Sequence, residues 1–131
     1  MVLAILGAAL TVSKDYRAAA EHLERALALD ANSAWAWTRS GWLNVHQGNW
    51  ELAIQQFERA QRLSPFDPSG FVCLFGIADA YFHAGKYDPA IDWSRKGLSQ
   101  APGAAWQLRV LVPALIHAGR LDEAAWRHIQ D

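Results

Sequence analysis

The chain has 131 residues, of which 52% are apolar, so it can bury a core and is too apolar for a disordered segment. Its 12 basic and 13 acidic residues give a net charge of −1, which argues against nucleic acid or an anionic membrane surface as the main partner. The single cysteine, Cys73, excludes an internal disulfide framework and a multi-cysteine zinc site.

The first segment, residues 1–12, is apolar and predicts a core helix. It lacks the basic start of a signal peptide, since the first charge is Lys14, and it is too short to span a membrane as a helix. We therefore expect a cytoplasmic protein. A second helix is predicted at 16–29, with Asp15 as its N-cap.

The next stretch, residues 34–65, predicts two amphipathic helices joined by a turn at Gly48, a residue suited to the left-handed conformation that ends a helix. Helical spacing puts Trp37, Gly41 and Asn44 on one face of the first helix, and Ala53, Phe57 and Ala60 on one face of the second. The first helix is expected to be capped by Asn32 or Ser33, and the second to span 50–63 before Pro65 stops it.

The remaining helices follow the same order. Asp67 before Pro68 favours a fifth helix at 68–84. A sixth is predicted at 87–99, and a seventh from Gly103 to a point before Gly119. Pro113 lies within the seventh helix and is expected to kink it, because proline has no N–H to donate. An eighth begins near Leu121.

These helices form repeats. Equivalent alanines lie 34, 37 and 34 residues apart, at Ala19, Ala53, Ala90 and Ala124. A period near 34 with two helices per unit is typical of a helical solenoid, in which each unit buries its apolar face against the next.

The second unit resembles a tetratricopeptide repeat, whose pattern combines W-x2-L-G-x2-Y with a following alanine, aromatic, alanine and proline. The matching residues are Trp37, Gly41, Ala53, Phe57, Ala60 and Pro65, whereas Ser40 and Asn44 depart from the pattern. The other units match more loosely, and Ser94 and Gly97 replace the aromatic and the alanine in the third. The resemblance implies an all-α, right-handed solenoid that forms a single domain. Its four repeats would span residues 1–32, 33–66, 67–103 and 104–131, the last truncated.

In that family the first helix of each pair lines a concave groove, so the resemblance implies which side chains bind a partner. The groove-binding candidates are Trp35, Arg39, Trp42, His46, Phe75, Asp79, Phe82, His83, Trp106, Arg109 and His117. Exposed aromatic residues and arginines are the usual binding hot spots. The alternative is that these rings fill the inner side of the superhelix or pack on a neighbouring domain. Two tryptophans on second helices, Trp93 and Trp126, are expected to face outward.

Neither catalysis nor metal binding is expected in this chain. There is no glycine-rich phosphate loop, G-x-S-x-G or H-E-x-x-H motif, so the sequence predicts a protein that is not an enzyme and has no cofactor. Three histidines recur two residues before a glycine, at His46, His83 and His117. Helices pack about 8–10 Å apart, too far for these side chains to share one metal ion, so no metal site is expected.

The sequence therefore predicts a non-catalytic scaffold or regulatory module that binds a protein or peptide. The chain starts and stops inside a repeat and lacks polar capping helices, which indicates a fragment of a longer protein or a homo-oligomer formed through the uncapped ends. Short phrases around 26–37 and 62–71 resemble the repeat region of bacterial adenylate or guanylate cyclases and winged-helix transcription regulators. That resemblance implies the alternative function of a sensory or oligomerising arm in bacterial signalling.

Overall fold

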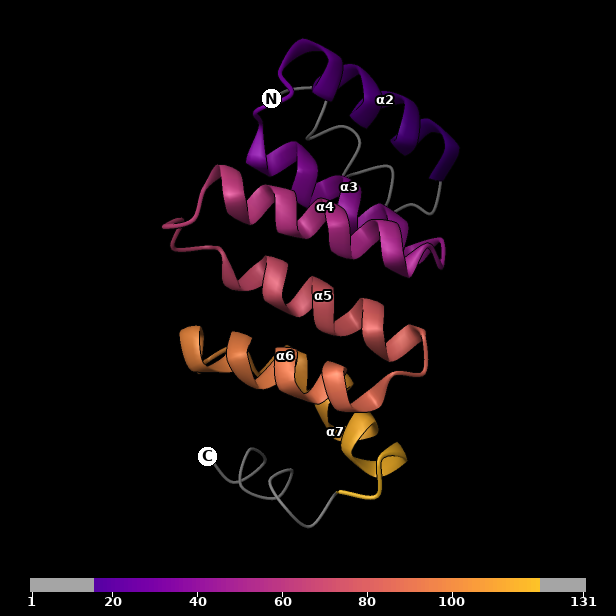
Figure 1. The fold of residues 1–131 in the computed structure, drawn as a ribbon, viewed down its shortest axis with the longest axis vertical. Coiled ribbons are helices and arrows are strands. Elements are labelled where there is room, and N and C mark those ends of the chain that lie inside the picture. Colours follow the sequence, from indigo (N-terminus) through magenta and orange to yellow (C-terminus); the bar gives the residue numbers. More distant parts are fainter. Residues whose placement is uncertain (1–15, 121–131) are drawn as a thin grey trace.

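The structure is a computed structural model that describes residues 16–120. Every regular element in this range is helical (Figure 1). The elements are α2 (Tyr16–Leu29), α3 (Ala34–His46), α4 (Trp50–Leu63), α5 (Phe71–His83), α6 (Tyr87–Gln100), the short 3-10 helix η1 (Ala105–Gln107) and α7 (Leu108–His117). The predicted all-helical solenoid is confirmed. The helices predicted at 1–12 and from Leu121, and Trp126, lie outside the described residues.

The predicted turns come from glycines at the ends of α3, α5 and α7. Gly48, Gly85 and Gly119 have φ angles of 82°, 76° and 70°, the left-handed region that glycine adopts without strain. After Gly48, the N–H of Asn49 donates to the carbonyl of Asn44 at 2.8 Å, which closes the helix end. The start of α3 is capped as predicted, because Ser33 Oγ accepts the N–H of Ala36 at 3.2 Å.

The prediction that the fifth helix starts near Pro68 is wrong, since α5 begins at Phe71. The Asp67 side chain forms a turn instead of a helix cap. Its Oδ1 accepts the N–H of Ser69 at 2.9 Å and the Ser69 hydroxyl at 2.7 Å, and the Asp67 carbonyl accepts the N–H of Gly70 at 2.9 Å. These local bonds compete with helix formation, so they hold 67–70 as a turn.

The seventh predicted helix is divided into η1 and α7. Residues Ala105–Gln107 form one 3-10 turn before the α-helix starts at Leu108. Pro113 lies inside α7 as expected. The carbonyl of Arg109, four residues earlier, cannot receive a backbone hydrogen bond from it.

The core is built where the two helices of a repeat cross. Ala53 and Phe57 of α4 are completely buried, and Ala60 is 3% exposed, as their spacing predicted. The ring of Phe57 lies against two glycines, because a Cβ atom added to Gly41 or Gly76 would lie 2.7 or 2.2 Å from it. The Phe57 ring therefore joins α3 of its own repeat to α5 of the next.

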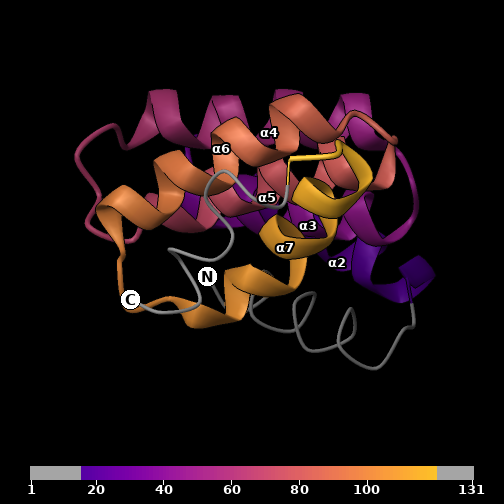
Figure 2. The same ribbon diagram turned by 90° about the horizontal axis from the view of Figure 1, so that it is seen from below.

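The helices form two layers. Figure 2 shows α4 and α6 in one layer, with α3, α5 and α7 in the other. Within the layer of α3, α5 and α7, each helix contacts the next, α3 with α5 and α5 with α7. Helices α4 and α6 have no comparable contact with each other. The α3–α5–α7 layer is therefore the more tightly curved, inner one, where the family resemblance expects the groove.

Candidate functional site

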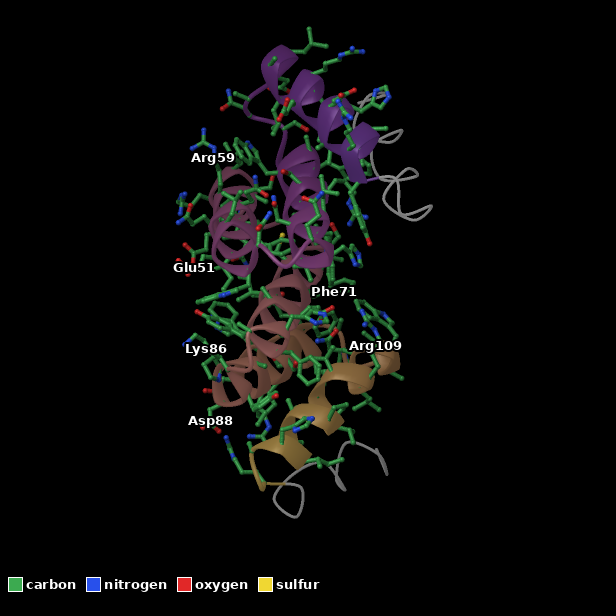
Figure 3. The ribbon with its side chains drawn as sticks, turned by 90° about the vertical axis from the view of Figure 1, so that its right-hand side faces the viewer. Glu51, Arg59, Phe71, Lys86, Asp88 and Arg109 are labelled. Atoms are coloured by element: carbon green, nitrogen blue, oxygen red, sulfur yellow. The ribbon has the colours of Figure 1, made fainter. Side chains whose placement is uncertain are left out.

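The helices of the inner layer expose aromatic, arginine and histidine side chains to solvent, fully or in part. We call these residues the inner surface: Trp35, Arg39, Trp42 and His46 on α3, Phe82 and His83 on α5, and Trp106, Arg109 and His117 on η1 and α7. All of them are exposed or half-buried. Figure 3 shows Arg109 on one side of the molecule, and Glu51, Arg59, Lys86 and Asp88 of the second helices and their turns on the other.

At the start of α3, the guanidinium of Arg39 lies over the ring of Trp35, 5.4 Å from its centroid. The Trp35 side chain is 37% exposed. The Nε atom of Arg39 is buried and has no hydrogen-bond acceptor among the described residues. Burial lowers the pKa of Arg39 from its ordinary value. A guanidinium keeps its charge at neutral pH, so this site holds a cation without a carboxylate partner in residues 16–120.

Arg39 also lines a pocket of about 200 Å³ at the junction of α3, α4 and α5. Other residues around it include Trp35, Gln61, Ser64, Asp67 and Ser69. Cys73 lies at its buried side, 3.5 Å from the hydroxyl of Thr38. Burial raises the pKa of the Cys73 thiol, as is usual for a structural buried cysteine. Sequence reasoning missed this pocket because the α4–α5 turn completes it.

At the other end of the inner surface, Trp106 and Arg109 form a similar pair. The Arg109 guanidinium lies 6.0 Å from the centre of the Trp106 ring, and Trp106 is 46% exposed. Unlike Arg39, Arg109 has an acidic partner, since its Nη2 donates to Asp79 Oδ2 at 3.2 Å.

Two predicted groove residues do not line the inner surface. Phe75 is completely buried, with its ring edge-on to that of Trp106 at 4.9 Å, and a Cβ atom on Gly97 would lie 2.4 Å from it. Gly97 admits the Phe75 ring into the core, which explains why an alanine is missing there. Asp79 is only 2% exposed, so it is a buried network residue and not an open contact.

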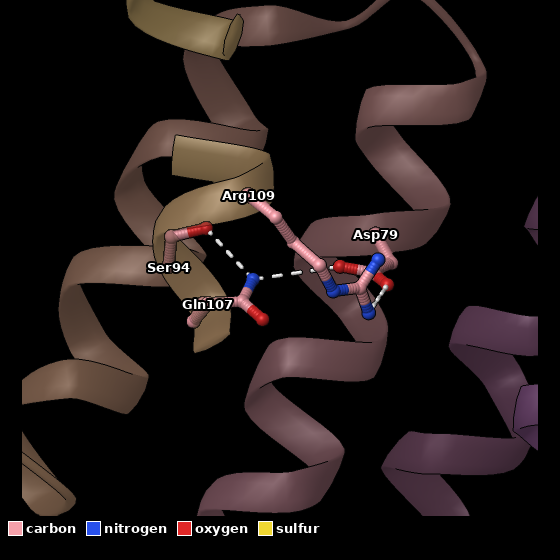
Figure 4. A network of polar contacts seen from close by, with 4 residues as sticks. All are labelled: Asp79, Ser94, Gln107 and Arg109. Carbon is pink, nitrogen blue, oxygen red and sulfur yellow. Dashed lines mark hydrogen bonds and ion pairs between the residues drawn. The ribbon is translucent and has the colours of Figure 1, made fainter. Parts of the chain in front are cut away.

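Asp79 belongs to a polar network between the third and fourth repeats (Figure 4). The amide Nε2 of Gln107 lies 3.2 Å from Ser94 Oγ and 3.4 Å from Asp79 Oδ1. Gln107 and Ser94 are completely buried. Burial raises the pKa of Asp79, while the charge of Arg109 acts in the opposite direction.

This network replaces an aromatic pair. In the second repeat Trp42 meets Phe57 edge-on at 5.6 Å. The residues 37 positions later are Asp79 and Ser94, so both rings of the pair become polar side chains. Sequence comparison of the repeats detects that loss, but it did not identify Gln107, whose side chain fills the space from the following repeat.

Trp42 is more deeply involved in packing than the sequence suggested. It packs against both the core cluster around Phe57 and the one around Phe75, although its side chain is half-buried. The Trp42 Nε1 is buried without an acceptor among the described residues. Trp37, which shares a helix face with Gly41, is equally half-buried and donates from its Nε1 to the Ala31 carbonyl at 2.8 Å. Burial therefore does not separate these two tryptophans.

The three histidines are all exposed, in the last turn of their helices. His46 stacks on Tyr16 at 6.3 Å, and His117 stacks on Tyr87 at 4.8 Å. Burial by its neighbours lowers the pKa of His46, and the nearby His83 and Arg109 act in the same direction. Among residues 16–120 no group of three or more histidine, cysteine, aspartate or glutamate side chains is placed to hold a metal ion.

The tryptophans of the outer side differ from those of the inner surface. Each has a cation of the same side over its ring: Arg59 over Trp37, Lys86 over Trp50 and Lys96 over Trp93. Trp93 is half-buried and packs against the core, so it is less open than predicted. Trp35 and Trp106 are the exposed tryptophans of the described chain.

Within the described part of the chain, no helix is long and apolar enough to cross a membrane.

Comparisons with known proteins give the same fold. The chain is similar to a solved structure of a MamA mutant, with a TM-score of 0.72 at 25% identity, over 98% of this chain and 73% of that one. It is also similar to the APC/C hetero-tetramer Cut9-Hcn1, with a TM-score of 0.87 at 20% identity, over 98% of this chain and 25% of that one. The O-GlcNAc transferase of Thermobaculum terrenum gives a TM-score of 0.77 at 22% identity, over 87% and 21%.

The search of curated protein sequences gives no significant match. Residues 8–68 match the family model described as Tetratricopeptide repeat. The resemblance to the repeat regions of nucleotide cyclases and winged-helix regulators has no support from these comparisons. The family match covers residues 8–68, somewhat less than half of the chain, and the structure of residues 16–120 has the all-helical solenoid fold that such repeats form.

Proposed function

We infer that the chain is a non-catalytic scaffold that binds a segment of a partner protein along its inner surface. The observation that carries this proposal is the exposure of Trp35 and Trp106, each paired with an arginine, on the inner layer of the solenoid. Tryptophan and arginine are the residues that most often dominate binding energy at protein interfaces. Exposed apolar surface rimmed by polar residues is typical of interaction sites.

The arrangement suits an extended or helical segment. Trp35 lies in the first turn of α3, and Trp106 lies in η1, just before α7. Because α5 packs between α3 and α7, the two tryptophans belong to opposite sides of α5 along the inner layer. Between them, the half-buried ring of Phe82 contacts two histidines. Its centroid lies 5.8 Å from that of His83 and 6.4 Å from that of His117. A bound segment would cover several repeats at once, as solenoid ligands do.

The charge of the chain supports a protein partner over nucleic acid, because the net charge is −1 and each second helix is balanced. A cytoplasmic location fits this proposal.

The experiment is a selection of random twelve-residue peptides on the immobilised chain, followed by titration of individual peptides. Trp106→Ala should weaken the selected peptides by about 30-fold, since truncating an aromatic hot spot costs about 2 kcal/mol or more. Leu52→Ala is the matched control, because Leu52 is an apolar side chain of α4 that is 45% exposed on the outer side. Peptides that lose affinity with Leu52→Ala and not with Trp106→Ala would place binding on the outer side and refute the proposal.

A further inference from the structure

The charges of the solenoid are unevenly divided between its two kinds of helix. Each of α2, α4 and α6 carries two basic and two acidic side chains, so each is neutral. The inner helices carry Arg39 and Arg109 against the single acid Asp79, which is buried and already paired with Arg109. The charge of Arg39 is therefore the one that the inner layer leaves unbalanced.

The surroundings of Arg39 show what is missing there. Its guanidinium is held over Trp35, and its buried Nε has no acceptor within residues 16–120. A buried donor without an acceptor is costly, and a charged one more so, unless a ligand supplies the acceptor. The same side chain forms part of the wall of the pocket of about 200 Å³ between α3 and the α4–α5 turn.

We propose that this pocket is a subsite for a carboxylate side chain of the bound protein segment, with Arg39 as its hydrogen-bond donor and Trp35 as the apolar wall beside it. This inference rests on the proposed function and names the chemistry of the partner: an acidic segment with apolar residues flanking the acid. A carboxylate offers two oxygens to a guanidinium fork, which makes arginine its most specific partner.

One carboxylate of the chain, Asp67, also lines the pocket. Both hydrogen bonds from Ser69 go to its Oδ1, and they lower the pKa of Asp67, so it is ionised at neutral pH. Asp67 is exposed, where solvent screens its charge, while the Nε of Arg39 is buried. The opposing signs of these two residues make the pocket testable, because an anionic and a cationic ligand must respond to their neutralisation in opposite ways.

The probes are three fluorescein-labelled twelve-residue peptides that alternate phenylalanine with glutamate, glutamine or lysine. They are titrated at one salt concentration against the full chain and its variants Arg39→Gln, Asp67→Asn and Arg62→Gln. Arg62 is an exposed side chain of α4 on the outer side, so Arg62→Gln makes the same change in net charge away from the pocket. Trp106→Ala is included to report on the inner surface as a whole.

We expect the glutamate peptide to bind most tightly. Arg39→Gln should weaken it about tenfold or more, the usual effect of losing a hydrogen bond to a charged group, and should leave the glutamine peptide unchanged. Asp67→Asn should strengthen the glutamate peptide, and Arg62→Gln should change it little.

Two results overturn the carboxylate subsite while the proposed function stands. The first is a glutamine peptide that loses affinity with Trp106→Ala yet binds as tightly as the glutamate peptide. The second is a lysine peptide that binds most tightly and is weakened by Asp67→Asn, which would assign the pocket to a cation. If the glutamate peptide binds and Trp106→Ala does not affect it, the proposed function fails. The subsite then survives only if Arg39→Gln still weakens that peptide.

Discussion

Gly76 of α5 lies directly against the ring of Phe57, so closely that a Cβ atom at Gly76 would lie 2.2 Å from Phe57 Cζ. The glycine belongs to the third repeat and the ring to the second. This contact sets how near successive repeats approach, and therefore how the inner helices are spaced along the binding surface.

Gly76→Ala should destabilise the chain, although alanine is the better helix former by about 1 kcal/mol. The added methyl group must displace the Phe57 ring, and overpacking of a close-packed core costs about 1–3 kcal/mol. Urea unfolding measures the effect. Gly103→Ala is the control, because a Cβ atom there meets nothing within 4 Å. Equal midpoints for the two variants would show that the repeats are not in van der Waals contact at Gly76.

The inner-surface tryptophans should differ in their contribution to stability. Trp42 packs on two core clusters, so Trp42→Ala should cost most of the roughly 3–5 kcal/mol of a buried aromatic truncation. Trp106 is 46% exposed, so Trp106→Ala should reduce the free energy of unfolding by less than half as much. Denaturant unfolding of both variants checks the order. If Trp106→Ala unfolds the chain as readily as Trp42→Ala, Trp106 is a core residue, and its exposure gives no support to a binding role.

The buried carboxyl of Asp79 should make stability depend on pH. Burial, opposed by Arg109, raises its pKa above the ordinary 3.8 in the folded state. At pH values between the pKa of the unfolded chain and the raised pKa of the folded state, the folded state binds more protons than the unfolded chain. The free energy of unfolding therefore falls as pH rises through that window and then levels off.

Asp79→Asn removes this titratable carboxyl group. We expect the variant to gain stability relative to the parent chain as pH rises from about 3.5 to about 7, spanning the range where a perturbed aspartate titrates. Urea midpoints at several pH values measure the difference. If the parent chain instead gains stability relative to the variant over this range, the ion pair with Arg109 outweighs burial. Ser99→Ala, at an exposed site on α6, controls for general effects of pH.

The helices were predictable because their signals are local. The bounds of α2 and α4 follow from the spacing of small and apolar residues, and the end of α3 follows from Gly48. The start of α5 was missed because Asp67 before Pro68 fits a helix cap and a turn equally well. The hydroxyl of Ser69 decides between them by donating to Asp67.

The candidate site was predictable only where one helix determines exposure. Periodicity within each helix, combined with the groove geometry that the family resemblance implies, pointed to Trp35 and Trp106, which are exposed, and to Arg39, which is half-buried. It failed for Phe75, because the burial of that ring depends on Gly97 in another helix. It also missed Gln107, which the 3-10 turn η1 places against α5 and α6. Such contacts between repeats are set by the packing of whole helices and not by the spacing within one.

The central claim is that a partner segment lies along the inner surface, and the tryptophans provide its most direct test. The chain is labelled with 5-fluorotryptophan, each signal is assigned by substitution, and a selected peptide is titrated while fluorine NMR spectra are recorded. The account predicts that the signals of Trp35 and Trp106 shift on binding, while those of Trp37, Trp50 and Trp93, which lie under cations of the outer side, stay in place. Shifts confined to those three outer tryptophans would contradict it.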